Sequence, residues 1–283
     1  MSSAPTTDSS ASPADSSLGE VLLSLSNVSL RLSGAPVLAG VSFDIRDRVR
    51  PGVTTGQLVG VLGPSGVGKT RLLRIIAGLD APDAGEVRGL KGAAIAPGSV
   101  GVVFQNYPLL RHRTIAQNLD IAGAAGGMNR AQARERTRSL LERFGLTDRA
   151  HFYPAQLSGG QRQRVAIAQQ LVQPRNLLLM DEPFSGLDPA TLDEVIRLVV
   201  EVANMNELNT ILVVTHDIRA AMVVSDTLLM LGRERVEGKA VAGAKVQATY
   251  DLVAQGLAWQ AGVEELPVFG QLEKEIKGRF GLL

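Results

Sequence analysis

The sequence contains no cysteine, which excludes disulfide bonds and cysteine-based metal sites. No apolar run approaches the roughly 18 residues that a membrane-spanning helix requires, so association with a membrane would need a partner. The formal net charge is only +1, which excludes the global basic field of a typical nucleic-acid-binding protein. What remains, 45% hydrophobic and 20% charged residues, is typical of a globular protein.

The start of the chain lacks side chains that a folded segment could bury. It consists mainly of Ser, Ala, Pro, Thr and Asp, so we expect a disordered tail over residues 1–19. It also lacks the basic start and apolar stretch of a secretory signal, which predicts a cytoplasmic protein.

Apolar patterns predict the class of fold. Residues 21–45 alternate in polarity, which is typical of half-buried antiparallel strands. Continuous apolar runs at 58–62, 177–180 and 211–214 predict strands that are buried on both faces of a sheet. Helical patterns follow the last two runs. This alternation predicts a doubly wound α/β fold with a mostly parallel sheet.

The remaining segments are less regular. Residues 47–57 are polar and predict a loop, 83–104 predict short strands, and 114–146 predict helices. Beyond Gly232 the clearest pattern is an apolar stripe with a period of four, which predicts a helix packed on the main domain. This stripe consists of Leu272, Ile276 and Phe280.

A glycine-rich loop follows the first buried run and matches the pattern G-x-x-x-x-G-K-[ST]. Main-chain amides and a helix N-terminus in such a loop bind phosphate oxygens. Lys69 would contact the β- and γ-phosphates, and the Thr70 hydroxyl would bind Mg²⁺. The motif predicts binding of ATP with Mg²⁺ by Gly63, Pro64, Ser65, Gly66, Val67, Gly68, Lys69 and Thr70.

Two carboxylates follow the apolar run 177–180. At the carboxyl end of a buried strand, Asp181 would bind Mg²⁺ and Glu182 would polarise a water molecule. His216 follows the run 211–214 and is placed to reach the γ-phosphate. Taken alone, the carboxylate pair would more commonly be an ordinary strand end, and His216 would more commonly be a structural histidine.

The segment Leu157-Ser158-Gly159-Gly160-Gln161 resembles the signature of the ABC ATPases. A helix is expected directly after it, which makes a second anion-binding helix N-terminus. The resemblance implies that Ser158, Gly159, Gly160 and Gln161 bind the ATP held by a second ABC ATPase subunit. The protein would then work as a homodimer or heterodimer.

Further motifs follow in the order of that family. Gln105 resembles the Q-loop glutamine, residues 185–188 resemble the D-loop, and His216 resembles the switch histidine. The resemblance covers residues 25–231 and implies catalytic roles for Glu182, His216 and Gln105, with Thr70, Gln105 and Asp181 at the metal. It implies an ATPase domain over 20–235, with an antiparallel β subdomain and a helical subdomain at about 106–160, followed by a C-terminal helical extension over 236–283.

The flanking residues resemble those of bacterial importers, namely Tyr153-Pro154 and Gln161 to Arg164. The tail pattern, which runs from Tyr250 to Trp259, resembles nitrate, sulfonate and taurine uptake subunits. The implied protein powers import through a separate integral-membrane permease, with an external solute-binding protein as a further partner and no nucleic acid. It would lie in the cytoplasm, peripherally on the inner face of the membrane.

The sequence departs from the family at several positions. Leu32 stands where an adenine-stacking aromatic residue is usual, which predicts weaker ATP binding and poorer discrimination against GTP. Residues 48–55 resemble an insertion, and Gln169 replaces a common arginine. The alternative functions are a soluble ABC ATPase without a transport role, a subunit for export or lipid trafficking, and a P-loop kinase.

Overall fold

The structure is a computed structural model that describes residues 17–49, 56–205, 210–258 and 262–283. Three expectations concern positions outside these ranges. They are the disorder of residues 1–16, most of the expected insertion (50–55), and Trp259 in the tail pattern.

The described strands form one mixed sheet of nine strands, in the order β4-β1-β2-β9-β8-β3-β7-β6-β5. From β8 to β5 all neighbours are parallel, whereas β1 pairs antiparallel with β2 and β4. This arrangement confirms the α/β prediction. The strands are β1 (Ser17–Leu32), β2 (Ala35–Val49), β3 (Gln57–Leu62), β4 (Ala84–Arg88), β5 (Gly101–Val103), β6 (Leu177–Asp181), β7 (Thr210–Thr215), β8 (Thr227–Val236) and β9 (Lys239–Asp251).

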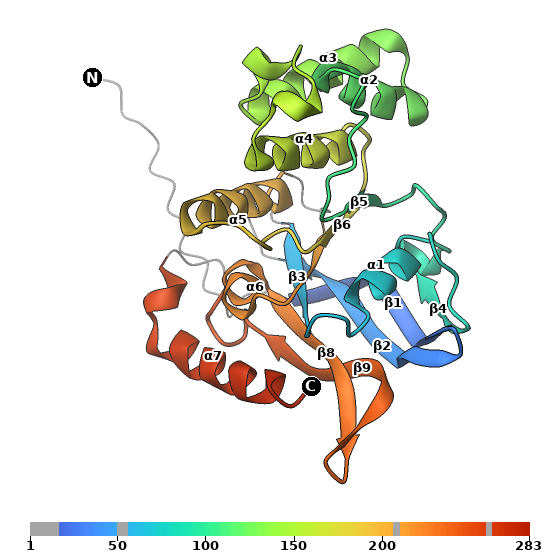
Figure 1. Cartoon of the computed structure of the whole chain (residues 1–283), viewed down its shortest axis with the longest axis vertical. Coiled ribbons are helices and arrows are strands. Elements are labelled where there is room, and N and C mark those ends of the chain that lie inside the picture. The colour runs from blue at the N-terminus through green and yellow to red at the C-terminus, as the bar shows by residue number, and fades with distance from the viewer. Residues whose placement is uncertain (1–16, 50–55, 206–209, 259–261) are drawn as a thin grey trace.

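Helices cover the sheet on two sides and form a separate group beyond its end (Figure 1). In that view, α1 lies on one side of the central strands and α5, α6 and α7 on the other, while α2, α3 and α4 lie together at the top. The helices are α1 (Lys69–Ile76), α2 (Ile115–Ala125), α3 (Arg130–Arg143), α4 (Gly159–Leu171), α5 (Pro189–Ala203), α6 (Ile218–Val224) and α7 (Pro267–Phe280). None of the helices in the described ranges has the length and apolar character needed to cross a bilayer.

Strands lie at three places where the sequence predicted other structure. Residues 17–19, expected at the end of the disordered tail, begin β1, where Ser17 and Leu18 pair with Val49 and Arg48 of β2. Residues 47–49, expected in a loop, continue β2 because Arg48 and Val49 pair with the start of β1. Residues 239–251, assigned to a helical extension, form β9 because a tight turn folds them back onto β8. Glu237 and Gly238 in this turn both have positive φ, 50° and 77°, as two-residue hairpin turns require. The predicted apolar stripe does form α7, with Leu272 and Ile276 buried.

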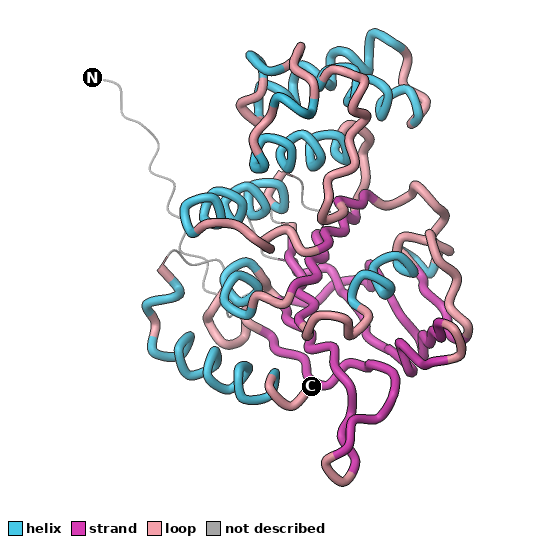
Figure 2. The backbone as a smooth tube through the Cα atoms, in the orientation of Figure 1, coloured by secondary structure: helices cyan, strands magenta, loops and turns pink. Residues whose placement is uncertain are grey.

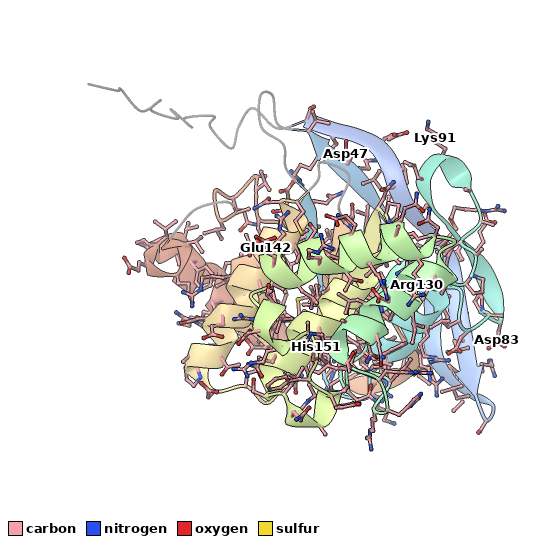
Figure 3. The ribbon with its side chains drawn as sticks, turned by 90° about the horizontal axis from the view of Figure 1, so that it is seen from above. Asp47, Asp83, Lys91, Arg130, Glu142 and His151 are labelled. Atoms are coloured by element: carbon pink, nitrogen blue, oxygen red, sulfur yellow. The ribbon has the colours of Figure 1, made fainter. Side chains whose placement is uncertain are left out.

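The starts of α2, α3 and α4 are stabilised by capping residues. A side-chain oxygen of Thr114, Asn129 and Ser158 accepts a main-chain hydrogen bond at the start of α2, α3 and α4 respectively. A glutamine three residues later completes a capping box in each case. Seen from above, α3 extends between Arg130 and Glu142 across the molecule (Figure 3). The predicted helical stretch 114–146 is therefore two helices, separated by residues 126–129.

The strands β4, β1 and β2 join the rest of the sheet through β9, which pairs with β2 at Leu38 and Ala244 and runs antiparallel to β8. The tube in Figure 2 shows the strands continuing through the centre of the molecule across this junction. Val37, beside the junction, also lies against the glycine-rich loop, since a Cβ atom added to Gly68 would be 3.0 Å from its side chain. The junction thus places the β1–β2 turn, which Leu32 precedes, on the same side as the loop.

Candidate nucleotide site

The glycine-rich loop joins β3, which is buried along its whole length, to α1. Gly66 and Gly68 have φ values of 76° and 112°, a region that disfavours other residues. Gly63 is needed for a different reason, because a Cβ atom there would lie 2.5 Å from the carbonyl oxygen of Leu231. The glycines of the motif therefore follow from the geometry of this loop.

Lys69, the first residue of α1, is only 5% exposed and points into the loop. Its Nζ donates to the carbonyl oxygens of Gly63, at 2.7 Å, and Pro64, at 3.1 Å. It also lies 3.1 Å from Oε1 of Glu182. The ammonium group is thus held inside the loop, close to the first carboxylate after β6.

Thr70 and Asp181 bring together two oxygens that suit a hard cation. The Thr70 hydroxyl donates to Oδ1 of Asp181 across 3.1 Å. Asp181 is 5% exposed, and burial raises the pKa of its carboxyl group, with Thr70 opposing this shift and the nearby charge of Glu182 adding to it. The donor set fits Mg²⁺, which uses few protein oxygens and completes its shell with water and phosphate. The described residues contain no cluster of three or more His, Cys, Asp or Glu that would bind a metal without such ligands.

Glu182 is held at both carboxylate oxygens. Oε1 faces Lys69, while Oε2 accepts from the Thr215 hydroxyl at 3.2 Å and lies 2.8 Å from Nδ1 of His216. The main-chain N–H of His216 also donates to Oε2, at 3.3 Å. The backbone of Glu182 has φ of 49°, an unusual value that costs about 1 kcal/mol or more for a non-glycine residue. This backbone conformation turns the side chain toward β7.

His216 directly follows β7, and 45% of its side chain is exposed. Its neighbour Thr215 is fully buried and accepts from the main-chain N–H of Asp217 at 3.1 Å. The sequence identified His216 but gave Thr215 no role. The only signal was its position at the end of a buried strand.

Gln105 follows β5 in an exposed turn. Among the described residues, the hydrogen bonds around Asp181 and Thr70 do not include its side chain. Strand β5 pairs with β6, with Val103 opposite Met180, so Gln105 lies at the same sheet edge as Asp181. Its predicted place at the metal stays a prediction.

The signature residues form a separate cluster at the start of α4. Ser158 caps this helix by accepting from the main-chain N–H of Gln161 at 3.2 Å. A Cβ atom added to Gly159 would have no neighbour within 4 Å, and one added to Gly160 would only just touch Thr191 at 4.0 Å. In Figure 1, α4 lies with α2 and α3, well separated from the loop that precedes α1. The structure therefore does not bring Ser158 to Lys69 within one chain.

Gln163 connects the two clusters. It is 1% exposed, and its Nε2 donates to the carbonyl oxygen of Pro183, the residue after Glu182, at 3.2 Å. Its Oε1 is buried without a hydrogen-bond partner among the described residues. In the sequence, Gln163 is notable only as part of the importer-like segment from Gln161 to Arg164. Its buried contact with the segment after β6 has no signal in the sequence.

Comparisons with known proteins agree with these features. Residues 47–185 match the sequence profile of the ABC transporter family. The chain is 40% identical over 222 residues to a sulfate/thiosulfate import ATP-binding protein of Vibrio cholerae, covering 75% of this chain and 56% of the relative. It is 38% identical over 216 residues to an aliphatic sulfonates import ATP-binding protein of Burkholderia cenocepacia, covering 76% and 62%. The chain thus spans little more than half the length of these relatives.

Solved structures show the same fold. The ATP-binding cassette MJ0796, described as a dimer in a post-hydrolysis state with ADP and Pi, superposes with a TM-score of 0.65 at 28% identity, covering 82% of this chain and 99% of that one. The cbiO1 protein of Clostridium perfringens gives a TM-score of 0.70 at 23% identity, covering 91% and 99%. Together with the phosphate loop, the paired carboxylates and the signature, these matches show that residues 47–185 form a domain of the ABC transporter family.

Proposed function

We propose that this chain binds ATP with Mg²⁺ and hydrolyses it as the nucleotide-binding subunit of an importer. The observation that carries the proposal is the position of Glu182, which forms a salt bridge with Lys69 of the phosphate loop and a hydrogen bond with His216. The names of the relatives, which are import ATP-binding proteins for sulfate, thiosulfate and sulfonates, support the importer part.

Each residue has a role that follows from its position. Lys69 and the main-chain amides of the loop bind the phosphates. Thr70 and Asp181 would hold Mg²⁺, which would supply positive charge against the phosphate groups. Glu182 accepts a proton from the attacking water, whose oxygen bonds to the γ-phosphorus as the bond to ADP breaks. His216 steadies Glu182 on one side and offers the exposed part of its side chain to the γ-phosphate.

The signature cluster supports a dimer. Ser158 and the open glycines of α4 lie away from the phosphate loop of their own chain, and they leave room for a group from outside. In the proposed dimer, each signature contacts the ATP bound by the other subunit. ATP closes the pair because it binds the closed state more tightly, and hydrolysis reopens it. An integral-membrane permease would convert this motion into transport and would hold the chain at the inner face of the membrane.

Glu182→Gln tests the hydrolytic role. We expect ATP hydrolysis by the purified protein to fall at least about 100-fold, because the amide cannot accept the proton. ATP binding, measured by equilibrium dialysis, should persist because Lys69 and the loop are unchanged. Hydrolysis near the parent rate would remove Glu182 from the mechanism. Phosphate transfer to a small molecule without ATPase activity would favour the kinase alternative instead.

A further inference from the structure

A pocket outside the nucleotide site lies between the β8–β9 hairpin and the end of α7. Its volume is about 260 Å³. In Figure 1 the chain end after α7 reaches the strands β8 and β9 at this place. The pocket is lined by Met230, Arg233, Arg235, Gln247, Ala248, Arg279, Leu282 and Leu283.

The lining combines cations with an apolar wall. Arg233, Arg235 and Arg279 supply guanidinium groups, and no acidic side chain is among the lining residues of the described chain. Arg279 is paired with Glu275 at 3.2 Å, and Arg235 donates to the carbonyl oxygen of Leu282 at 2.7 Å. Arg233 makes no salt bridge within the described ranges. The lining side chains therefore carry positive charge, and the guanidinium group of Arg233 has donors left for a ligand.

Arg233 and Arg235 are two residues apart in β8, a spacing that favours one face of the strand, and the pairing of this segment with β9 is irregular. The pairing with β9 shifts between Arg233, opposite Ala244, and Arg235, opposite Ala240. Such a bulge re-aims side chains that a regular strand would place on fixed faces. The opposite wall is fixed by close packing, because the side chain of Leu283 occupies the space that a Cβ atom on Gly232 would need.

The pocket is joined to the phosphate loop by β8 itself. Met230 lines the pocket and pairs with Leu62, the residue before Gly63. The next residue, Leu231, places its carbonyl oxygen against Gly63. A displacement of β8 at the pocket would therefore reach the first residue of the phosphate loop directly.

We propose that this pocket binds a small organic anion with a short aliphatic body, such as an alkanesulfonate, and that binding alters the phosphate loop through β8. The charged head contacts Arg233 and Arg279, and the aliphatic part lies against Ala248 and Leu282. The size fits a ligand smaller than a drug molecule. A resulting change in ATP turnover rests on the function proposed above, whereas binding itself does not.

The test uses 1-pentanesulfonate as the probe, with 1-pentanol and inorganic sulfate as controls that lack the charge or the aliphatic body. Calorimetric titration of the full chain should detect binding of pentanesulfonate alone. Arg233→Gln and the pocket-filling Ala248→Phe should each weaken it by about tenfold or more, since a charge-assisted hydrogen bond or the space is lost. Arg197→Gln, an exposed position on α5, is the matched control and should leave binding unchanged.

Equal binding of 1-pentanol, or equal weakening by Arg197→Gln, would overturn the anion site. Hydrogen exchange of residues 63–69 with and without the probe tests the link to the phosphate loop separately from ATPase activity. Unchanged exchange in a chain that binds the probe would overturn that link. A chain that shows the probe-dependent change but no ATP hydrolysis would contradict the proposed function and leave the pocket intact.

Discussion

Asp181 keeps a carboxyl group inside the protein, and burial raises its pKa above the ordinary value for aspartate. A pKa that is higher in the folded than in the unfolded chain favours folding at low pH, where the group is protonated. This contribution is lost as the pH rises through the raised pKa. At neutral pH the ionised group therefore works against folding until a cation binds.

Asp181→Asn removes this ionisation. We expect the Tm of the variant in magnesium-free, nucleotide-free buffer to exceed that of the parent at pH 8 by about 2–4 °C, equivalent to roughly 1 kcal/mol for a chain of this size. The difference should shrink as the pH falls, because both carboxyl and amide are then neutral. Scanning calorimetry at several pH values measures it. A lower Tm at pH 8 would contradict the effect of burial, and Mg²⁺-ATP should stabilise the variant less than the parent.

For Glu182 the sequence predicts the chemical role but not the contacts that hold the side chain. Its position after a buried strand predicted a role with water, and the structure places its carboxylate against Lys69 and His216. The motif could not indicate that Thr215 donates to the same carboxylate or that the backbone has positive φ. Those details depend on how β6 and β7 end side by side, which is a matter of packing rather than of local pattern.

Among the elements, α4 connects the signature to the carboxylates through one buried amide. Gln163 donates to the carbonyl oxygen of Pro183, and its own Oε1 has no partner within the described chain. The contact ties the position of α4 to the segment that carries Glu182. A change of charge at this point should therefore act on both clusters.

Gln163→Glu would place a carboxylate where no donor is available and would point it toward a carbonyl oxygen. We expect a loss of several kcal/mol in the free energy of unfolding, measured by urea titration, because an unpaired buried charge is costly. Gln169→Glu on the same helix is the control and should change stability little, since that side chain is partly exposed. Equal stability of the two variants would show that Gln163 is not confined as described.

The elements themselves were mostly predictable. Continuous apolar runs marked β3, β6 and β7, and helical periodicity marked α5 and α7, because burial on one or both faces leaves a direct trace in the order of residues. Strand β9 was missed because its burial alternates only weakly, and its main signal is the Glu237-Gly238 turn. The extension of β2 to Val49 was missed because a polar strand end resembles a loop.

For the whole molecule, the separation of the signature from the phosphate loop is the feature that favours a dimer. In the Glu182→Gln background, ATP should produce a stable dimer that light scattering detects. Adding Ser158→Arg should abolish this dimer while ATP binding persists, because Ser158 lies at an exposed helix start away from its own loop. Adding Lys69→Ala should abolish both.

Ser139→Arg, an exposed position on α3, supplies the same added charge away from the signature and should leave the dimer intact. If Ser158→Arg dimerises with ATP as well as the Ser139→Arg control does, the signature has no part in the interface. The open space beside Gly159 and Gly160 would then have no role in dimer formation.

Gly159 and Gly160 also bear on the difference between stability and function in this chain. Neither Gly159 nor Gly160 has positive φ, and a methyl group at either would meet almost nothing within the chain. Alanine favours a helix interior over glycine by about 1 kcal/mol, so the stability of α4 gives no reason for glycine at its first two residues. The open space beside both glycines is what contact with a group from outside the chain would require. Variants with a larger side chain at these two positions would fold normally and would lose only the proposed contact with the second subunit.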